Sequence, residues 1–378
     1  MVEQELKEDD EENEGLANDD LFNITSWGAD LSFRELISMY KEKDIEKPEL
    51  QRNYVWTKLE ASRFIESILM GLPVPSIFLA NKPESNKKLI VDGYQRLMSV
   101  YDFVENGIFS GDNSIFALSN SKKINYRWRN RTFKQLSEDE QRKIRTTTIH
   151  AIVFEQKEPK DKDTSLFQIF ERINTGGRAL NAQEIRNCIY QGEFNSALMK
   201  CNKYLAWRQL YENNQDVSED VLDNRMIDIE YILRYAALVH TDLINLKKNQ
   251  IGLKLFLNDF MHNTPKDIFE PLLEKFKNNM NFIATHIGLN AFRNYNFEEQ
   301  RDTNKFHATI FDSIAIATTL YKDEKIQDLP KRRLNLLQDE GYKQFISTRT
   351  TNVNNIINRI NIAANYLYDK NLPIKDVE

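Results

Sequence analysis

The hydrophobic pattern of this chain changes near residue 155, and the change restricts the folds that it can adopt. Before that point, apolar residues at helical spacing alternate with β-branched runs such as TTTIHAIVFE at residues 146–155. From Thr164 onward, nearly all apolar patterns follow the helical period. A chain of 378 residues is also long enough for two domains. We therefore expect an α+β domain over residues 26–155 and a mostly α-helical domain over residues 156–378.

Local signals place several helix starts and strands. A serine, threonine or asparagine followed three residues later by glutamate caps the first turn of a helix. The pairs of this kind are Ser32/Glu35, Thr57/Glu60, Ser137/Glu140 and Asn181/Glu184. Gly71 and Gly107 are predicted to end two of the helices. Besides the run at residues 146–155, strands are expected at residues 72–80 and 89–91, with an edge strand or strand-like loop in the Pro-containing segment IEKPELQRNYVW at residues 45–56.

Charge is distributed unevenly along the chain. Residues 1–20 contain ten acidic residues and one lysine, whereas residues 21–378 contain 47 acidic and 50 basic residues. We interpret residues 1–25 as a solvated, disordered acidic arm, with self-inhibition of a basic groove as the alternative. The nearly neutral body shows no basic stripe and gives no electrostatic argument for strong nonspecific binding to DNA.

The composition also bears on location. No apolar run approaches the length of a membrane span, and the acidic N-terminus does not resemble a signal peptide. The chain has two cysteines, Cys188 and Cys201, which suit a reducing compartment and are interpreted as structural. We expect a soluble cytoplasmic protein with no membrane partner.

The stretch KLIVDGYQRLMSV at residues 88–100 carries the main candidate site. A strand that passes through a glycine turn into a helix presents backbone N–H groups at the helix N-terminus, where the dipole favours anions. Gly93 allows close approach, and Arg96 and Gln95 could contact phosphate oxygens. Asp92 could orient Arg96, cap the helix, or hold a Mg²⁺ ion shared with phosphates. The structural alternative is a turn followed by an ordinary N-cap.

Two further polar groups have both a functional and a structural interpretation. Gln51 and Arg52 lie close to Tyr54 and Trp56, a set that could contact a base or could simply face solvent on an edge strand. The segment RINTGGRALNAQE at residues 172–184 places two glycines between helices. It is either a sharp helix-turn-helix corner or a means of aiming Asn174 and Arg178 at the pocket of Arg96.

Four segments follow one another along the chain: PELQRNYVW, SILMGLPVPSIFL, LIVDGYQRLMSVYDF and FQIFERINTGGRALNAQEIRN. In this order they resemble the N-terminal domain of the GmrSD-type restriction endonuclease family, which is placed in the ParB/sulfiredoxin-like superfamily. The resemblance covers about residues 31–190. It implies an α+β domain with a small mixed sheet whose Asp-Gly-Gln-Gln-Arg motif binds, and often hydrolyses, a nucleoside triphosphate. The setting it implies is bacterial anti-phage or restriction-type defence against foreign or modified DNA.

The resemblance also assigns roles to individual residues. Those expected to act in hydrolysis are Asp92, Gln95 and Arg96, with Asp92 as a ligand of Mg²⁺. Those expected to bind a nucleotide of unknown base are Gln51, Arg52, Gly93, Tyr94, Asn174 and Arg178. Tyr94 replaces the first glutamine of the motif, so it could stack on a base, and hydrolysis would be lost if that glutamine positions water.

Members of this family often end in an HNH nuclease domain, and the sequence does not predict one here. Such a site needs histidines clustered around a metal ion. The five histidines, at positions 150, 240, 262, 286 and 307, are all more than 20 residues apart. We therefore expect a module that binds a nucleotide and could act as an NTPase. Its expected partners are DNA and a separate nuclease or effector subunit. The alternative is a non-catalytic nucleotide or DNA sensor that recruits the effector; cleavage by this chain alone ranks last.

Overall fold

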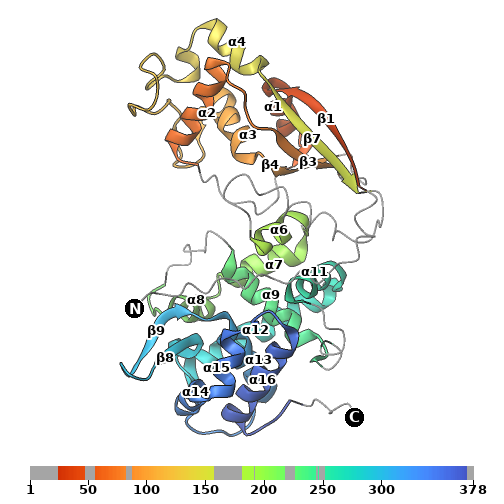
Figure 1. Ribbon diagram of the computed structural model, residues 1–378, viewed down its shortest axis with the longest axis vertical. Helices are drawn as coiled ribbons and strands as arrows, with labels where there is room; N and C mark the ends of the chain where they lie inside the picture. Colours follow the sequence, from red (N-terminus) through yellow and green to blue (C-terminus); the bar gives the residue numbers. More distant parts are fainter. Residues whose placement is uncertain are drawn as a thin grey trace. The chain divides into compact units, whose positions relative to one another are not determined.

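A computed structural model describes residues 24–46, 56–81, 87–156, 181–190, 192–217, 226–243, 246 and 252–372 (Figure 1). The chain divides into two compact units, one ending at Ile189 and the other beginning at Tyr190. The first contains a five-stranded mixed sheet with helices, and the second is mostly helical. The predicted fold class is confirmed. The division falls later than residue 155 because α6 (Ala182–Ile189) packs Ile185 against the sheet.

The sheet of the first unit has the strand order β1-β7-β3-β4-β2. The strands are β1 (Ile24–Ser32), β7 (Thr148–Gln156), β3 (Ile77–Asn81), β4 (Lys88–Asp92) and β2 (Ile45–Glu46). β1 pairs with β7 antiparallel along its whole length, β3 is parallel to β7 and antiparallel to β4, and β2 is parallel to β4. The Pro-containing segment thus begins with an edge strand, as predicted; its residues 47–55 lie outside the described residues.

The capping pairs predicted the starts of most helices of the first unit. Besides α6, these helices are α1 (Phe33–Lys41), α2 (Lys58–Met70), α3 (Tyr94–Tyr101) and α4 (Glu138–Thr146). α3 is the exception, because it begins after Gly93 without a side-chain cap. α1, α2 and α4 each start with a complete capping box, and α2 ends at Gly71 in a left-handed conformation. The Asn181 carboxamide likewise accepts a 2.8 Å hydrogen bond from the backbone N–H of Glu184 ahead of α6. These starts are local, which is why the sequence alone could place them.

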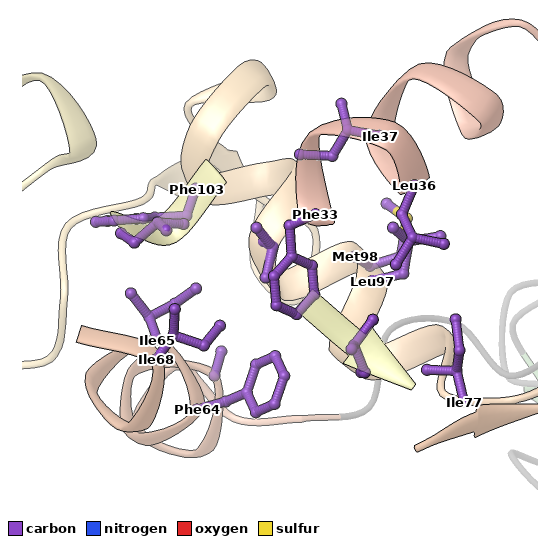
Figure 2. Packing of buried hydrophobic residues seen from close by; sticks show 14 of the residues in the cluster. Phe33, Leu36, Ile37, Phe64, Ile65, Ile68, Ile77, Leu97, Met98 and Phe103 are labelled. Atoms are coloured by element: carbon purple, nitrogen blue, oxygen red, sulfur yellow. The ribbon is translucent and has the colours of Figure 1, made fainter. Parts of the chain in front are cut away.

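Successive side chains of the strands point to opposite faces of the sheet, and each face belongs to its own hydrophobic cluster. On one face, side chains of α1, α2 and α3 converge with Ile77 of β3 (Figure 2). On the other face, Val91 and Phe154 pack with Ile185 of α6. Burying both faces in this way requires strands that are apolar at nearly every position, which the run LIV in β4 supplies.

The chain between α3 and α4 forms short irregular elements. α3 continues as a π-helical turn, η2 (Asp102–Asn106), and stops at Gly107 as predicted. A small hairpin of β5 (Ile108–Phe109) and β6 (Ser114–Ile115) follows, then a long loop and the 3₁₀ turn η3 (Phe133–Gln135).

Asp102 at the start of η2 makes stability of the first unit depend on pH. Its side chain is fully buried, and this burial raises the carboxyl pKa above its ordinary value of 3.8. The backbone N–H of Ser110 donates a 2.8 Å hydrogen bond to Oδ2, which lowers the pKa, but the effect of burial is larger. The folded state then binds more protons than the unfolded state between the two pKa values, so stability falls as pH rises through that window. We expect Asp102→Asn to gain stability relative to the parent as pH rises from the ordinary carboxyl pKa through the raised pKa of the folded state. Thermal unfolding midpoints of the parent and the variant, measured at a series of pH values, would show this. Asp139→Asn, which changes an exposed aspartate, is the control. The prediction would be contradicted if the midpoints of Asp102→Asn and the parent changed in parallel with pH, or if Asp139→Asn diverged from the parent in the same way.

The second unit is built on helices. They are α7 (Glu193–Asn202), α8 (Leu205–Glu212), α9 (Ile227–His240), α11 (Leu253–Asn263), α12 (Lys266–His286), α13 (Ala308–Tyr321), α14 (Leu329–Gln338), α15 (Glu340–Ser347) and α16 (Val353–Tyr368). A hairpin of β8 (Arg293–Asn296) and β9 (Arg301–Phe306) follows the 3₁₀ turn η5 (Leu289–Phe292). α13 is central, since every residue from Thr309 to Thr318 is buried. No helix among the described residues is long and apolar enough to cross a membrane.

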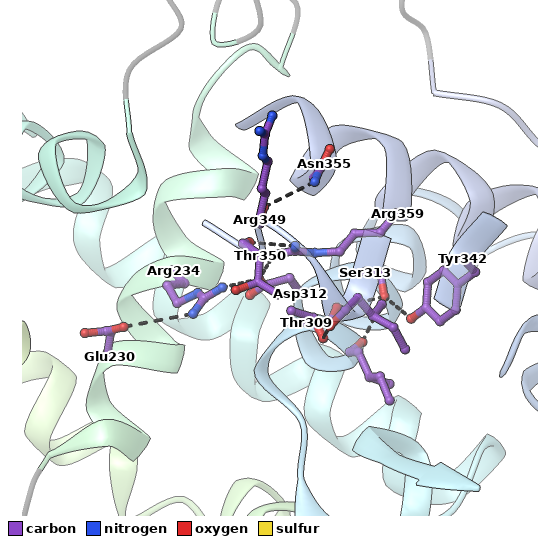
Figure 3. A network of polar contacts seen from close by, with 12 residues as sticks. Glu230, Arg234, Thr309, Asp312, Ser313, Tyr342, Arg349, Thr350, Asn355 and Arg359 are labelled. Atoms are coloured by element: carbon purple, nitrogen blue, oxygen red, sulfur yellow. Dashed lines mark hydrogen bonds and ion pairs between the residues drawn. The ribbon is translucent and has the colours of Figure 1, made fainter. Parts of the chain in front are cut away.

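A buried carboxylate joins three helices of the second unit. Asp312 of α13 accepts hydrogen bonds at Oδ2 from Arg234 of α9 and from Arg359 of α16, the latter at 2.6 Å (Figure 3). Arg359 also donates to the backbone carbonyl of Thr350 at 2.7 Å. Both arginine side chains are under a tenth exposed, and Asp312 is fully buried. The packing of α9, α13 and α16 therefore includes two buried cations that share one buried anion, and Arg234 has a second, more distant carboxylate in Glu230 at 4.0 Å.

Candidate functional site

The candidate site is the corner at which β4 ends and α3 begins. Gly93 forms the corner with φ +102° and serves as the N-cap of α3. A Cβ atom at this position would lie 2.3 Å from Cγ2 of Ile77. Glycine is therefore required twice, for the left-handed backbone and for the close packing of the turn against β3.

A β-bulge precedes the corner. Asp92 pairs with Phe78, but Ile90 pairs with the next residue, Leu79, so that Val91 is the extra residue of β4. A bulge bends its strand and redirects the residues that follow, and bulges are common beside functional sites. The bulge accordingly contributes to the placement of the Asp92 side chain at the end of the strand.

Asp92 and Arg96 form a close ion pair at this corner. Nη2 of Arg96 lies 2.6 Å from Oδ2 of Asp92, and Nη1 lies 3.3 Å from the same oxygen. Nη1 also donates to the backbone carbonyl of Ser76 at 3.2 Å. The Arg96 side chain is 14% exposed and that of Asp92 is 37% exposed. Of the roles considered for Asp92, the structure shows the orientation of Arg96; α3 has no side-chain cap hydrogen bond.

Gln95 connects the corner to the segment before α2. Its Oε1 accepts a hydrogen bond of 3.3 Å from the backbone N–H of Trp56. Trp56 follows the Pro-containing segment and packs edge-on against Phe64 of α2. Gln95 therefore helps to fix the first turn of α3 relative to the end of that segment.

The comparisons with known proteins bear on this corner. The family of the N-terminal domain of the GmrSD restriction endonuclease matches residues 33–191, which include the corner and the whole of β3, β4, α3 and β7. The chain contains a GmrSD-type N-terminal domain. The predicted resemblance is thus confirmed for residues 33–191. A search among curated proteins found no match.

Tyr94 is the position at which the sequence departs from the Asp-Gly-Gln-Gln-Arg motif that the resemblance implies. The residue is 6% exposed and belongs to the hydrophobic cluster beneath the helices. A side-chain hydrogen bond joins it to Tyr40 of α1. The structure thus gives Tyr94 a core position, and its ring could stack on a base only after leaving that packing.

The structure brings together only part of the predicted residue set of the GmrSD-type domain. Asp92, Gly93, Gln95 and Arg96 lie at one corner, together with the carbonyl of Ser76, which sequence reasoning did not find. The predicted residues Gln51, Arg52, Asn174 and Arg178 lie outside the described residues. Ser76 could have been suspected only from its place just before β3, because a backbone carbonyl leaves no signal in residue type.

Among the described residues, the corner offers one carboxylate, Asp92, to a metal ion. Across the described parts of the chain, no group of three or more His, Cys, Asp or Glu side chains could hold a metal ion. Asp92 uses Oδ2 for Arg96, and Oδ1 has no hydrogen bond within the described residues. One carboxylate oxygen fits Mg²⁺, which usually takes its remaining ligands from phosphates and water.

The histidines and Cys201 occupy structural positions. His150 of β7 lies 2.8 Å from Asp30 of β1 in a cross-strand pair, and burial lowers the pKa of His307. Cys201 is buried, and desolvation raises the pKa of its thiol to about 12, so the reactive thiolate is disfavoured. The side chain of Cys188 lies outside the described residues.

Proposed function

We propose that the corner between β4 and α3 binds a nucleoside triphosphate with Mg²⁺ and hydrolyses it, as the switch of a bacterial restriction-type defence system that acts on foreign or modified DNA. The observation that supports this most is the position of Arg96. Its guanidinium is held beside the first turn of α3 by Asp92 and by the carbonyl of Ser76. A fixed guanidinium next to a helix N-terminus is a favourable arrangement for phosphate oxygens.

The partial burial of Arg96 strengthens this argument. Its side chain is mostly shielded from water, so an anion at the corner would interact with it at a lower effective dielectric than at an open surface. Asp92 offsets the charge of Arg96 in the absence of a ligand. Mg²⁺ bound through the second oxygen of Asp92 would restore net positive charge to the corner and would offset the charge of the phosphates.

An alternative proposal is a sensor that binds the nucleotide without hydrolysing it. The observation in favour is Tyr94, because a buried aromatic residue stands where the family motif has a polar glutamine. The guanidinium of Arg96 is held by Asp92 and by the carbonyl of Ser76, and not by the side chain at position 94. Binding could therefore persist where the orientation of an attacking water is lost.

Arg96→Ala is expected to weaken nucleotide binding by about 10-fold to 100-fold, because it removes charge-assisted hydrogen bonds to phosphate. Calorimetry with ATP, GTP, CTP and UTP, each with Mg²⁺, would measure the change. Arg142→Ala is the matched control, since Arg142 forms an ion pair with Asp139 on the exposed surface of α4. Failure of all four nucleotides to bind the parent protein would remove the proposal.

Phosphate release distinguishes the hydrolase from the sensor. If the parent protein releases phosphate faster than Asp92→Asn and Arg96→Ala, the chain is an NTPase. Binding of a nucleotide with no release above these variants would favour the sensor. Thermal unfolding of each variant would confirm that the first unit remains folded.

A further inference from the structure

The first unit carries a basic surface on the loop between β6 and η3. Residues 113–137 contain no aspartate or glutamate, although acidic residues are frequent elsewhere in the chain. Within them, residues 119–134, here called the basic loop, contain six basic residues. These are Lys122, Lys123, Arg127, Arg129, Arg131 and Lys134. The nearly neutral total of the chain concealed this local excess, which is why sequence reasoning found no basic stripe.

The basic loop has a defined conformation. Ile124 and Trp128 are buried and anchor it in the core. Glu66 of α2 accepts a 2.6 Å hydrogen bond from the backbone N–H of Asn125, and Glu140 of α4 accepts one of 2.8 Å from Nε1 of Trp128. Anchors on two helices leave the residues between them with fixed positions on the surface. A binding partner would therefore meet a surface that is already organised.

The remaining side chains of the loop project outward. Lys122, Lys123, Arg131 and Lys134 are exposed, and none forms an ion pair within the described residues. Arg127 is also exposed but lies 3.0 Å from Glu140, which offsets part of its charge. Arg129 instead donates to the carbonyl of Ile124 at 2.7 Å and supports the loop itself. Within the described residues, the loop thus carries four exposed cations that form no ion pair.

Tyr126 belongs to the same loop and is 83% exposed, more than any other large apolar side chain in the described structure. Its neighbours Ile124 and Trp128 are buried, so the loop selects this ring for the surface. Cations bind phosphates, and an exposed aromatic ring offers a face on which an unpaired base can stack. An acidic peptide would be attracted by the cations but would make no comparable use of the ring.

We propose that the basic loop binds single-stranded DNA, with lysines and Arg131 on the phosphates and the ring of Tyr126 stacked on a base. The basic loop and the corner at Asp92 consist of different residues, and the proposal does not depend on nucleotide binding at the corner. It supplies the restriction-type domain with a direct contact to an unpaired strand.

Fluorescence anisotropy with a labelled oligothymidine of about 20 nucleotides, without nucleotide and over about 50 to 200 mM salt, tests the proposal. Tyr126→Leu should weaken binding by about 10-fold, whereas Tyr126→Phe should bind like the parent. Lys122→Gln/Lys123→Gln should reduce the slope of log affinity against log salt by about 1 to 1.5. The control Lys325→Gln/Lys331→Gln removes two exposed lysines from the second unit and should change neither quantity.

Several results would overturn the proposal. If Tyr126→Leu binds oligothymidine as tightly as the parent, the ring does not stack on a base. If the control pair Lys325→Gln/Lys331→Gln loses as much salt dependence as Lys122→Gln/Lys123→Gln, the binding reflects only the total charge of the protein. Binding of a polyglutamate peptide or of anionic vesicles in place of oligothymidine would assign the loop to a different partner. The loop variants should bind nucleotides with the same affinity as the parent in calorimetry. The test of DNA binding by the basic loop is therefore independent of the test of nucleotide binding at the Asp92 corner.

Discussion

Asp312→Ala is expected to lower the free energy of unfolding of the second unit by about 3–5 kcal/mol. The substitution leaves the guanidinium groups of Arg234 and Arg359 buried without the carboxylate that both contact. Packing does not offset the desolvation cost of a buried charge that has lost its partner. Asp312→Ala should therefore lower stability by more than a substitution that only leaves a cavity of the same size. Differential scanning calorimetry can follow the second unit through its own transition.

Two comparisons separate charge from packing in this prediction. Asp312→Asn keeps the shape and an acceptor oxygen but removes the charge, so most of the loss should persist. Asp323→Ala removes an exposed aspartate just after the same helix and should change stability by less than about 0.5 kcal/mol. A loss below about 1 kcal/mol for Asp312→Ala would mean that the two arginines do not depend on this carboxylate.

Gly93→Ala is expected to destabilise the first unit by about 1–3 kcal/mol more than Gly107→Ala. Both glycines have positive φ, at +102° and +71°, so both substitutions introduce backbone strain. Only at position 93 would the new Cβ meet another residue, since Ile77 lies within 2.8 Å by two of its atoms and nothing lies within 4 Å at position 107. The difference between the variants therefore measures the packing of the corner against β3.

Urea unfolding of the two glycine variants provides the measurement, and nucleotide titration of the same proteins adds a functional one. If the corner binds phosphate, Gly93→Ala should lose nucleotide affinity as the first turn of α3 shifts, while Gly107→Ala should retain it. Equal destabilisation by both substitutions would show that the turn can move away from Ile77 at little cost.

The candidate site could be predicted in its position but not in its internal contacts. A strand, a glycine and a helix in succession put Asp92, Gly93 and Arg96 at one corner by chain connectivity alone. The carbonyl of Ser76 reaches Arg96 because β3 pairs with β4, and the sequence contains no residue type that signals this. Tyr94 illustrates the same limit. It lies in the first turn of α3, and whether its ring faces the core or the solvent depends on the packing of the neighbouring helix α1, which the local sequence does not reveal.

The sequence by itself determined the starts of α1, α2, α4 and α6, the glycine ends of α2 and η2, and the division into a mixed and a helical part. These features depend on hydrogen bonds and apolar spacings within a few residues of one another. Only the tertiary structure decided that the largely exposed segment Ile24–Ser32 is a strand, because its backbone partners lie on β7, more than 100 residues later. It likewise decided the sharing of Asp312 by two arginines and the outward position of Tyr126, because burial depends on which distant segments cover a residue.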